Sequence, residues 1–229
     1  MVVRLLACTP DPEEVVAAAA QLCYSSSSIE QILEKGRSKK EALLKKILSA
    51  GHFSVLEHAA FTFGIEGISR ACSHQLVRHR VASFSQQSQR YVSAADRFGA
   101  VVPDSIAADV KIKERFESFL RDAFSLYDEL LQGGIPAEDA RFVLPNAVGT
   151  KLVVTMNARE LHHFFRLRCC LRAQWEIRAV AKEMLRQART AAPLLFFNAG
   201  PGCVAGECPE GAMSCGRMEE VRRDYAELG

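Results

Sequence analysis

Hydrophobic and polar positions follow two different periods along the chain. Alternating or short apolar runs, which are typical of strands, occur at residues 2–7, 60–65 and 151–156. Apolar residues spaced by three and four, which are typical of helices, occur at residues 12–23, 38–48, 69–81, 104–131 and 173–191. Asn157 is expected to begin one further helix directly after the last strand. This mixture of elements predicts an α+β fold.

Local signals mark where several of these helices begin and end. Asp11 is a good N-cap for the first helix, and Glu14 stands at the position of a capping box. Gly51 is expected to close the helix at 38–48, and Gly133 and Gly134 the long helix at 104–131.

Composition limits the function classes. The chain has 229 residues, of which 48% are hydrophobic, so it can bury the core of one domain or of one domain with a tail. Its 29 Lys and Arg nearly balance 27 Asp and Glu, whereas general nucleic-acid binders usually carry a larger excess. No run approaches the roughly 18 apolar residues of a membrane span. The N-terminus does not resemble a secretory signal, so we expect a cytoplasmic protein with its cysteines as thiols.

One stretch concentrates positive charge. RHRVASFSQQSQR, residues 78–90, holds three Arg, one His and three Ser, and no Asp or Glu occurs from Gly67 to Ala95. On the predicted helix, Gln75, Arg78 and His79 would share one face. Beyond it, Ser88 and Arg90 could grip a phosphate group together with backbone N–H groups. The stretch therefore indicates a pocket for a phosphorylated small molecule, with a solvated face or a nucleic-acid patch as the alternatives.

A second window without acidic residues runs from residue 161 to residue 175. Its basic residues are His162, His163, Arg166, Arg168 and Arg172. The two adjacent His cannot point the same way on a helix, so one of them is expected to be structural. Asn157 could both cap this helix and reach a ligand, and Arg168 lies nearly three turns further on. One helix could therefore contact both a cofactor and a substrate.

Three ordered segments of the chain resemble the flavin-dependent thymidylate synthase family. The spacing R-H-R-x2-S-x4-S-x-R fills every fixed position of that family's signature, with the residues Arg78, His79, Arg80, Ser83, Ser88 and Arg90. The segments 51–63 and 141–177 are similar to the family's histidine segment and second active-site segment. Together the resemblance covers about residues 1–200 and implies a catalytic domain at 1–202 followed by a Cys-containing tail at 203–229.

The resemblance implies a fold and a reaction. The family fold is α+β, with a central antiparallel or mixed sheet and long helices. It assembles as a homotetramer whose active sites lie at subunit interfaces. The implied reaction is methylation of dUMP to dTMP, with 5,10-methylenetetrahydrofolate as the carbon donor and NADPH as the reductant through bound FAD. Neither nucleic acid nor a membrane is an expected partner.

The resemblance also assigns residues to the two ligands. Those that match FAD-binding positions are His52, Ser54, Arg78, His79, Arg80, Gln86, Asn157, Arg159 and His163. Those that match positions around the nucleotide are Gln75, Arg78, Gln86, Gln87, Ser88, Gln89, Arg90, Arg141 and Arg168. The loop at 86–90 is expected to wrap the phosphate, and Gln86 departs from the acid found in several relatives.

Arg168 matches the residue that activates the uracil ring, and is the expected catalytic residue. A fixed cation near N3 and O2 would favour the ionised ring and make C5 more nucleophilic. Arg stays protonated, so its role would be electrostatic. Because no protein nucleophile is needed, the Ser88 hydroxyl is interpreted as a phosphate ligand.

The tail carries three further cysteines. Cys203, Cys208 and Cys215 have the spacing C-x4-C-x6-C with no His close by. They could bind zinc, form a redox pair or have no role. Zinc usually takes four ligands, so we expect no metal here and a tail that is dispensable for the chemistry.

Two other classes of function compete with the enzyme. A nucleic-acid binding module would need aromatic residues among the basic ones, yet only Phe84 and Tyr91 lie near. A metal-dependent hydrolase would need His and carboxylates together, and both basic windows lack carboxylates.

Overall fold

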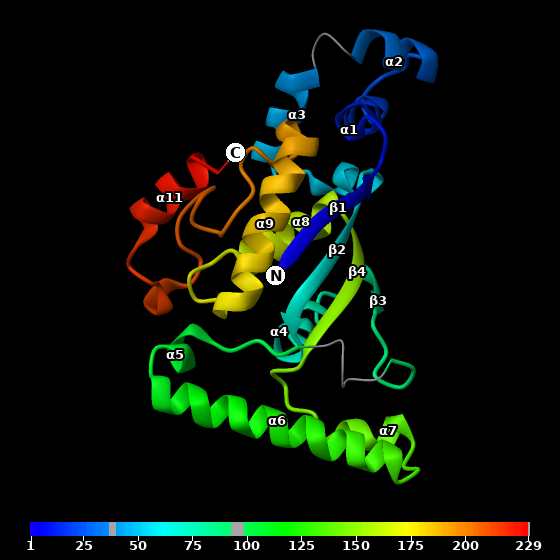
Figure 1. Ribbon diagram of the computed structural model, residues 1–229. Helices are drawn as coiled ribbons and strands as arrows, with labels where there is room; N and C mark the ends of the chain where they lie inside the picture. Colours follow the sequence, from blue (N-terminus) through cyan, green and yellow to red (C-terminus); the bar gives the residue numbers. More distant parts are fainter. Residues whose placement is uncertain (37–39, 93–98, 229) are drawn as a thin grey trace. The chain divides into compact units, whose positions relative to one another are not determined.

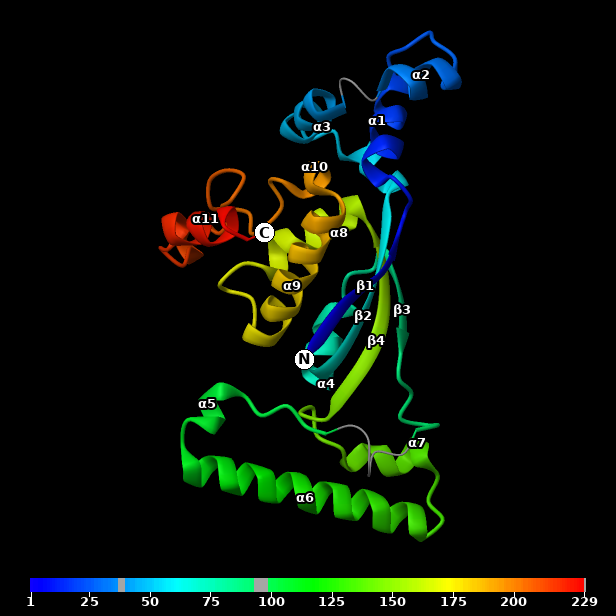
Figure 2. The ribbon, with the colours of Figure 1, turned by 45° about the horizontal axis from the view of Figure 1, so that its top comes forward.

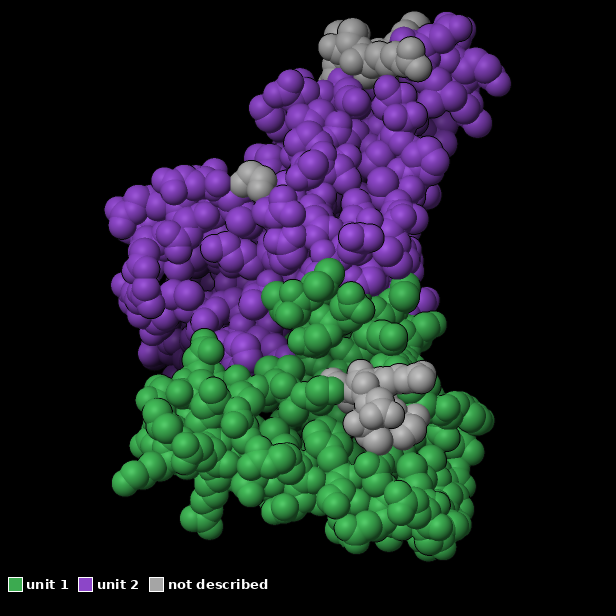
Figure 3. Space-filling model, viewed as in Figure 1, with its two compact units in different colours: residues 1–2, 65–78, 84–153 green, residues 3–64, 79–83, 154–229 purple. Residues whose placement is uncertain are grey.

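The computed structural model describes residues 1–36, 40–92 and 99–228. The chain divides into two compact units, which Figure 3 shows in different colours. Unit 1 comprises residues 1–2, 65–78 and 84–153, and unit 2 comprises residues 3–64, 79–83 and 154–229. Each unit is described separately below.

Four strands form one sheet. They are β1 (Val2–Cys8), β2 (Ala60–Ser69), β3 (Ala82–Gln86) and β4 (Gly149–Asn157), in the order β1-β2-β4-β3. The sheet is antiparallel. Between β2 and β4, for example, the hydroxyls of Thr62 and Thr155 are 2.9 Å apart, and the amide of Arg70 donates to the carbonyl of Val148. The predicted α+β class is confirmed.

Unit 2 contains most of the helices. They are α1 (Pro12–Leu22), α2 (Ile29–Gly36), α3 (Lys40–Ser49), η1 (Phe53–His58), α8 (Ala158–Arg168), α9 (Trp175–Ala191), α10 (Pro193–Phe196), η3 (Gly211–Met213) and α11 (Met218–Ala226). Helices α8 and α9 lie side by side (Figure 1). Phe61, Phe165 and Phe196 are fully buried and form edge-to-face ring contacts in the core.

The tail is packed against the rest of unit 2. Val221 and Tyr225 of α11 are buried, and the Tyr225 hydroxyl donates to the carbonyl of Cys169 at 3.0 Å. Arg189 of α9 donates to the carbonyls of Ala199, Tyr225 and Leu228 at 2.9, 2.6 and 2.7 Å. The tail therefore contributes to the core, and the boundary between residues 202 and 203 stays a prediction.

Unit 1 holds the longest helix. Its helical elements are α4 (Arg70–Leu76), α5 (Asp104–Ala107), α6 (Val110–Gln132), α7 (Ala137–Ala140) and η2 (Arg141–Val143). Asp109 caps α6, because its carboxylate accepts from the amides of Lys111 and Ile112 at 2.9 and 3.1 Å. Helix α6 runs unbroken between α5 and α7 (Figure 2) and contributes the fully buried Tyr127 to the core of the unit.

The structure corrects several sequence expectations. The predicted helix at 69–81 ends at Leu76, and residues 82–86 form strand β3, which was not predicted. Asp109 divides the predicted helix at 104–131 into α5 and α6. Asp11 occupies the N-cap of α1 with φ at 44°, but its side chain makes no cap hydrogen bond. Helices α2 and α11 were not predicted.

Residues 38–39 of the helix predicted at 38–48 lie outside the described residues. Within the part of the chain that is described, the helices are too short or too polar to cross a membrane.

Candidate active site

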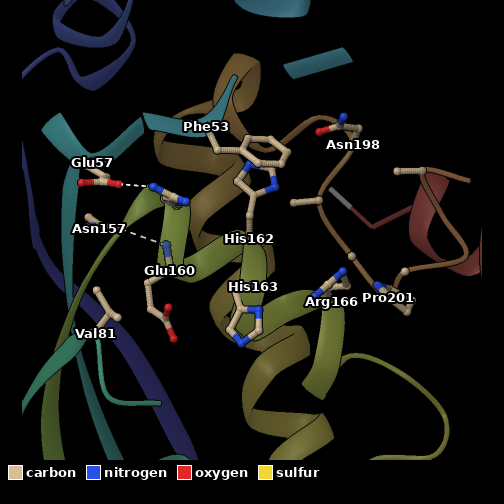
Figure 4. A pocket seen from close by; sticks show the side chains of 15 residues that line it. Phe53, Glu57, Val81, Asn157, Glu160, His162, His163, Arg166, Asn198 and Pro201 are labelled. Atoms are coloured by element: carbon tan, nitrogen blue, oxygen red, sulfur yellow. Dashed lines mark hydrogen bonds and ion pairs between the residues drawn. The ribbon is translucent and has the colours of Figure 1, made fainter. Parts of the chain in front are cut away.

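Unit 2 encloses a cavity of about 690 Å³ along one side of α8. Figure 4 shows the side chains that line it. They are Phe53, Glu57, Val81, Asn157, Arg159, Glu160, His162, His163, Arg166, Asn198, Ala199, Gly200, Pro201, Gly202 and Ala205. The volume lies in the range of small-molecule and cofactor sites.

The start of α8 fixes the cavity's polar side chains. Asn157 ends β4, and its side-chain oxygen accepts from the amide of Glu160 at 2.9 Å. This contact confirms the expectation that Asn157 caps the helix. From the cap onward, the turns of α8 carry Arg159, His163 and Arg166 to the cavity.

A chain of hydrogen bonds joins three side chains of unit 2. Nδ1 of His79 lies 3.1 Å from Oε1 of Glu160, and Nε of Arg168 donates to Nε2 of His79 at 3.1 Å. Burial, together with the charges of Arg168 and His163, lowers the pKa of His79 to about 4. His79 is therefore neutral, and its Nδ1–H donates to the carboxylate while Nε2 accepts from the guanidinium.

Glu160 completes this chain from a buried position. Only 8% of the residue is exposed, and burial raises its pKa, an effect that the neighbouring His163 partly offsets. The carboxylate selects the tautomer of His79, and that tautomer in turn orients Arg168. No sequence motif marked Glu160, because its partner His79 stands 81 positions earlier in the chain.

The same side chains have the composition of a metal site. Ligand atoms of His79, Glu160 and His163 lie within 4.8 Å of one another, and no other described group does so. Both ring nitrogens of His79 are already engaged, however, one of them by a guanidinium. A cation on that nitrogen would face the positive charge of Arg168, so we interpret the group as a hydrogen-bonded network.

The two adjacent His have different roles, as the sequence predicted. The ring of His162 stacks between Phe53 and Phe196, with centroids 5.6 and 5.4 Å away, and its Nε2 donates to the carbonyl of Leu195 at 2.8 Å. Burial lowers the pKa of His162. His163 is exposed and points away from Phe53 (Figure 4). His162 is thus structural and His163 is accessible to a ligand.

The cavity's donors and acceptors fit a large anionic cofactor such as FAD. Arg159, Arg166 and His163 can face a pyrophosphate, and Arg159 forms an ion pair with Glu57. The side-chain oxygen of Asn198 is buried without a hydrogen-bond partner. An N–H or O–H group of a bound ligand would satisfy that oxygen.

The segment 198–202, which precedes the tail, and Ala205 of the tail contribute to the cavity, which the sequence did not predict. His52 and Ser54 are exposed near η1, and Arg80 is exposed after His79. These three predicted flavin ligands do not line the cavity.

In unit 1, the helical face predicted for the signature does not form. Helix α4 ends before Arg78, so Gln75, Arg78 and His79 do not follow helical spacing. Gln75 is half-buried and donates to the carbonyl of Ala71 at 3.3 Å, whereas Arg78 is exposed. The amide of Arg78 donates to the carbonyl of Gln75 at 3.4 Å, so one turn at the end of α4 joins the two residues.

The side-chain amide of Gln86 donates hydrogen bonds that a carboxylate at this position could not make. Its Nε2 donates to the hydroxyls of Ser73 and Thr150 at 2.9 and 3.1 Å. The Ser73 hydroxyl itself donates to the carbonyl of Arg70 at 3.0 Å, so its oxygen is left to accept. A carboxylate at position 86 would bring no hydrogen to this contact.

The predicted phosphate loop follows β3. The Gln87 amide donates to the carbonyl of Lys151 at 3.0 Å, and Gln89 is buried. The amide of Arg90 donates to the Ser88 hydroxyl oxygen at 3.1 Å. Arg90 also forms an exposed ion pair with Glu138 at 2.7 Å, and such pairs contribute only about 0–1 kcal/mol. A phosphate could therefore replace Glu138 at modest cost.

Arg141 has a cationic neighbour that sequence patterns did not single out. Its Nε donates to the carbonyl of Glu138 at 3.0 Å. Burial lowers the pKa of Arg70, and the charge of Arg141 lowers it further. Two guanidinium groups that repel each other form a place where an anion would be stabilised.

Comparisons with known proteins identify the family. A family model described as "Thymidylate synthase complementing protein" matches residues 4–194. A flavin-dependent thymidylate synthase of Geobacter sulfurreducens is 60% identical over 100% of this chain and 99% of its own length. The chain belongs to the flavin-dependent thymidylate synthase family.

Further relatives of the same name support this family assignment. The protein of Clostridium tetani is 46% identical over 97% of this chain and 96% of its own length. That of Nitratidesulfovibrio vulgaris is 50% identical over 94% of both chains. Membership in the family favours the enzyme over the nucleic-acid binding and hydrolase alternatives.

Most residues that the family resemblance assigns to the nucleotide belong to one unit, and most that it assigns to the flavin belong to the other. Every assigned nucleotide ligand except Arg168 belongs to unit 1. Every assigned flavin ligand except Arg78 and Gln86 belongs to unit 2. Of the flavin ligands, Asn157, Arg159 and His163 line the cavity.

Proposed function

We propose that the protein methylates dUMP at C5 to form dTMP, with 5,10-methylenetetrahydrofolate as the carbon donor and NADPH as the reductant. The single strongest support is the Geobacter sulfurreducens relative, because its name denotes a flavin-dependent thymidylate synthase and its identity extends over the whole chain. The geometry of the two units is consistent with this proposal.

The nucleotide phosphate would be held by the loop at 86–90 in unit 1. Arg90 would exchange its exposed partner Glu138 for the phosphate, and the Ser88 hydroxyl, whose oxygen accepts from the Arg90 amide, would donate to it. The pair Arg70 and Arg141 would add positive charge. Ser88 is a ligand in this scheme and attacks nothing.

FAD would lie against α8 in the cavity of unit 2. Arg159, Arg166 and His163 would face its phosphates, and Asn198 would accept from one of its N–H or O–H groups. When bound, FAD would supply the hydride chemistry, while the protein supplies orientation and an electrostatic field.

Arg168 would activate the uracil ring. Its Nε is held by His79, which fixes the plane of the guanidinium. The terminal Nη groups would then meet N3 and O2 of the ring, favour the ionised form and raise the nucleophilicity of C5. Glu160 and His79 position this residue without contacting the substrate themselves.

The proposal includes a homotetramer with active sites formed by several subunits. Ile112, Phe119 and Leu126 of α6 are 54%, 57% and 44% exposed and are spaced by seven residues. Seven-residue spacing places apolar side chains along one seam of a helix, which another helix can cover. A second copy of the chain is the partner that this proposal assigns to the seam.

The decisive experiment combines binding and turnover. We expect FAD to change its absorption spectrum on binding and to raise the thermal midpoint of the protein. Thymidylate should form only when dUMP, methylenetetrahydrofolate and NADPH are all present. Failure of FAD to bind would contradict the flavin assignment, whereas binding without product would contradict the assigned reaction.

A further inference from the structure

Four cysteines line a second, much smaller cavity of unit 2. This cavity has a volume of about 20 Å³, and its lining includes Cys170, Cys203, Cys208 and Cys215. The sequence spacing drew attention to three of them and gave no fourth ligand. The structure adds Cys170, which follows α8 and lies 33 residues before Cys203.

Arginine side chains hold the backbone on both sides of this cavity. Nη1 of Arg178 donates to the carbonyl of Leu171 at 2.7 Å, next to Cys170. Nε and Nη2 of Arg222 donate to the carbonyls of Cys203 and Gly206 at 2.9 and 2.8 Å. The segment that carries Cys170 is therefore held to α9, and the segment that carries Cys203 is held to α11.

A close packing contact between Gly202 and Pro209 brings the loop that carries Cys208 to this cavity. A Cβ atom on Gly202 would lie 2.8 Å from Cγ of Pro209, so only a glycine allows these segments to approach so closely. Pro209 directly follows Cys208. Among the four cysteines, Cys203 is buried, Cys170 and Cys208 are half-buried, and Cys215 is exposed.

The four sulfur atoms carry no covalent partner. All four are free cysteines in the structure. A bound cation of high thiolate affinity would remove the mutual repulsion of the ionised sulfurs.

We propose that Cys170, Cys203, Cys208 and Cys215 bind one zinc ion as a structural tetrathiolate site. Four cysteines are a common ligand set for structural zinc, and the step Cys203-x4-Cys208 lies within the usual C-x2–4-C spacing. Soft sulfur ligands exclude magnesium and calcium. The site is independent of the function proposed above.

Zinc binding requires the loop cysteines to move closer. In a tetrahedral site with Zn–S bonds of about 2.3 Å, the sulfur atoms lie about 3.8 Å apart. No three of the four sulfurs lie within 4.8 Å of one another in the structure. Cys208 and Cys215 lie on irregular segments of the chain, so they are the ligands that close on the ion.

The zinc site would also stiffen the wall of the large cavity. Arg166, Pro201 and Gly202 line both cavities. Fixing Cys203 and Cys208 to the end of α8 would hold the segment 198–202, including Asn198, against the space assigned to the cofactor. The metal would act through position and would take no part in the reaction.

Metal analysis of the full-length protein tests the proposal. Protein purified under reducing conditions and dialysed should hold about one zinc per chain. Cys208→Ser and Cys215→Ser should each lower the zinc content at least about tenfold, because a trithiolate binds less tightly. Cys23→Ser, which changes an exposed cysteine outside the site, should leave it unchanged.

Thermal unfolding provides a second measurement. A chelator should lower the thermal midpoint of the wild type, added zinc chloride should restore it, and neither should affect Cys215→Ser. Zinc that survives both substitutions would overturn the ligand set. A disulfide among the four cysteines, bound iron, or failure of the reduced protein to take up added zinc would overturn the zinc site itself.

Discussion

Replacing Glu160 by Gln should slow the reaction while leaving the protein folded. The substitution keeps the size of a side chain that is 8% exposed and removes its charge. His79 then donates its Nδ1–H to a neutral amide oxygen, or the amide nitrogen turns toward Nδ1 and forces the other tautomer. In the second case Nε2–H faces Nε–H of Arg168, and the contact is lost.

The expected size of the effect follows from these two outcomes. Hydrogen bonds to charged groups contribute about 1.5–3 kcal/mol and neutral ones about 0.5–1.5 kcal/mol. Loss of the charge alone should therefore cost about 1 kcal/mol, or roughly fivefold in rate. Release of the Arg168 guanidinium should cost the whole charge-assisted contact, or roughly 10- to 100-fold.

Steady-state kinetics of thymidylate formation would measure the change. Because Glu160 acts through His79 and Arg168, kcat should fall more than KM for dUMP changes, and flavin content should stay normal. Glu57→Gln is the matched control, since Glu57 lines the same cavity but pairs with Arg159 at the surface. A kcat for Glu160→Gln within twofold of the wild type would refute the positioning role.

Four further outcomes follow from the structure. Arg168→Lys should raise the barrier of thymidylate formation by about 2–4 kcal/mol, since Lys keeps the charge but loses the planar fork; near-normal turnover would contradict this. Gln86→Glu should lower stability in urea by about 1–3 kcal/mol, because the carboxylate brings no hydrogen to Ser73; an unchanged midpoint would argue against it. His162 has a lowered pKa, so the unfolded state binds its proton more readily. Stability should therefore fall as pH drops below the ordinary His value of about 6.5, and the slope should be shallower in His162→Phe. Phe119→Asp should reduce the mass measured by light scattering, and an unchanged mass would mean that another face joins the subunits.

Local patterns predicted the elements whose signals lie within a few residues. Asn157 was identified as a helix start because a cap needs only its own helix. The division of labour between His162 and His163 followed from the geometry of adjacent helical positions. The end of α4 at Leu76 was missed because helical propensity continued while β4 offered residues 82–86 hydrogen bonds.

Contacts between distant segments set the limit of sequence reasoning. Glu160 meets His79, and Cys170 meets the tail cysteines, only after the sheet and α8 have formed. The second window without acidic residues directed attention to Arg168. It did not point to Glu160, the carboxylate that holds His79 against Arg168, because Glu160 stands one residue before that window. The tail was expected to be dispensable because composition does not show that Ala205 lines the cavity or that Tyr225 contacts Cys169.

Arg189 is half-buried, and backbone carbonyls near the end of the chain take the place of water around its guanidinium. Its guanidinium donates to the carbonyls of Phe196 and Ala199, which precede the tail, and to those of Tyr225 and Leu228 near the end of the tail. Trimming the last few residues would remove carbonyls that stand in for water around a half-buried cation. The hydrogen bonds lost would be those of Arg189 on α9, more than 30 residues before the cut. Shortened versions of this enzyme should therefore be designed together with a neutral residue at position 189.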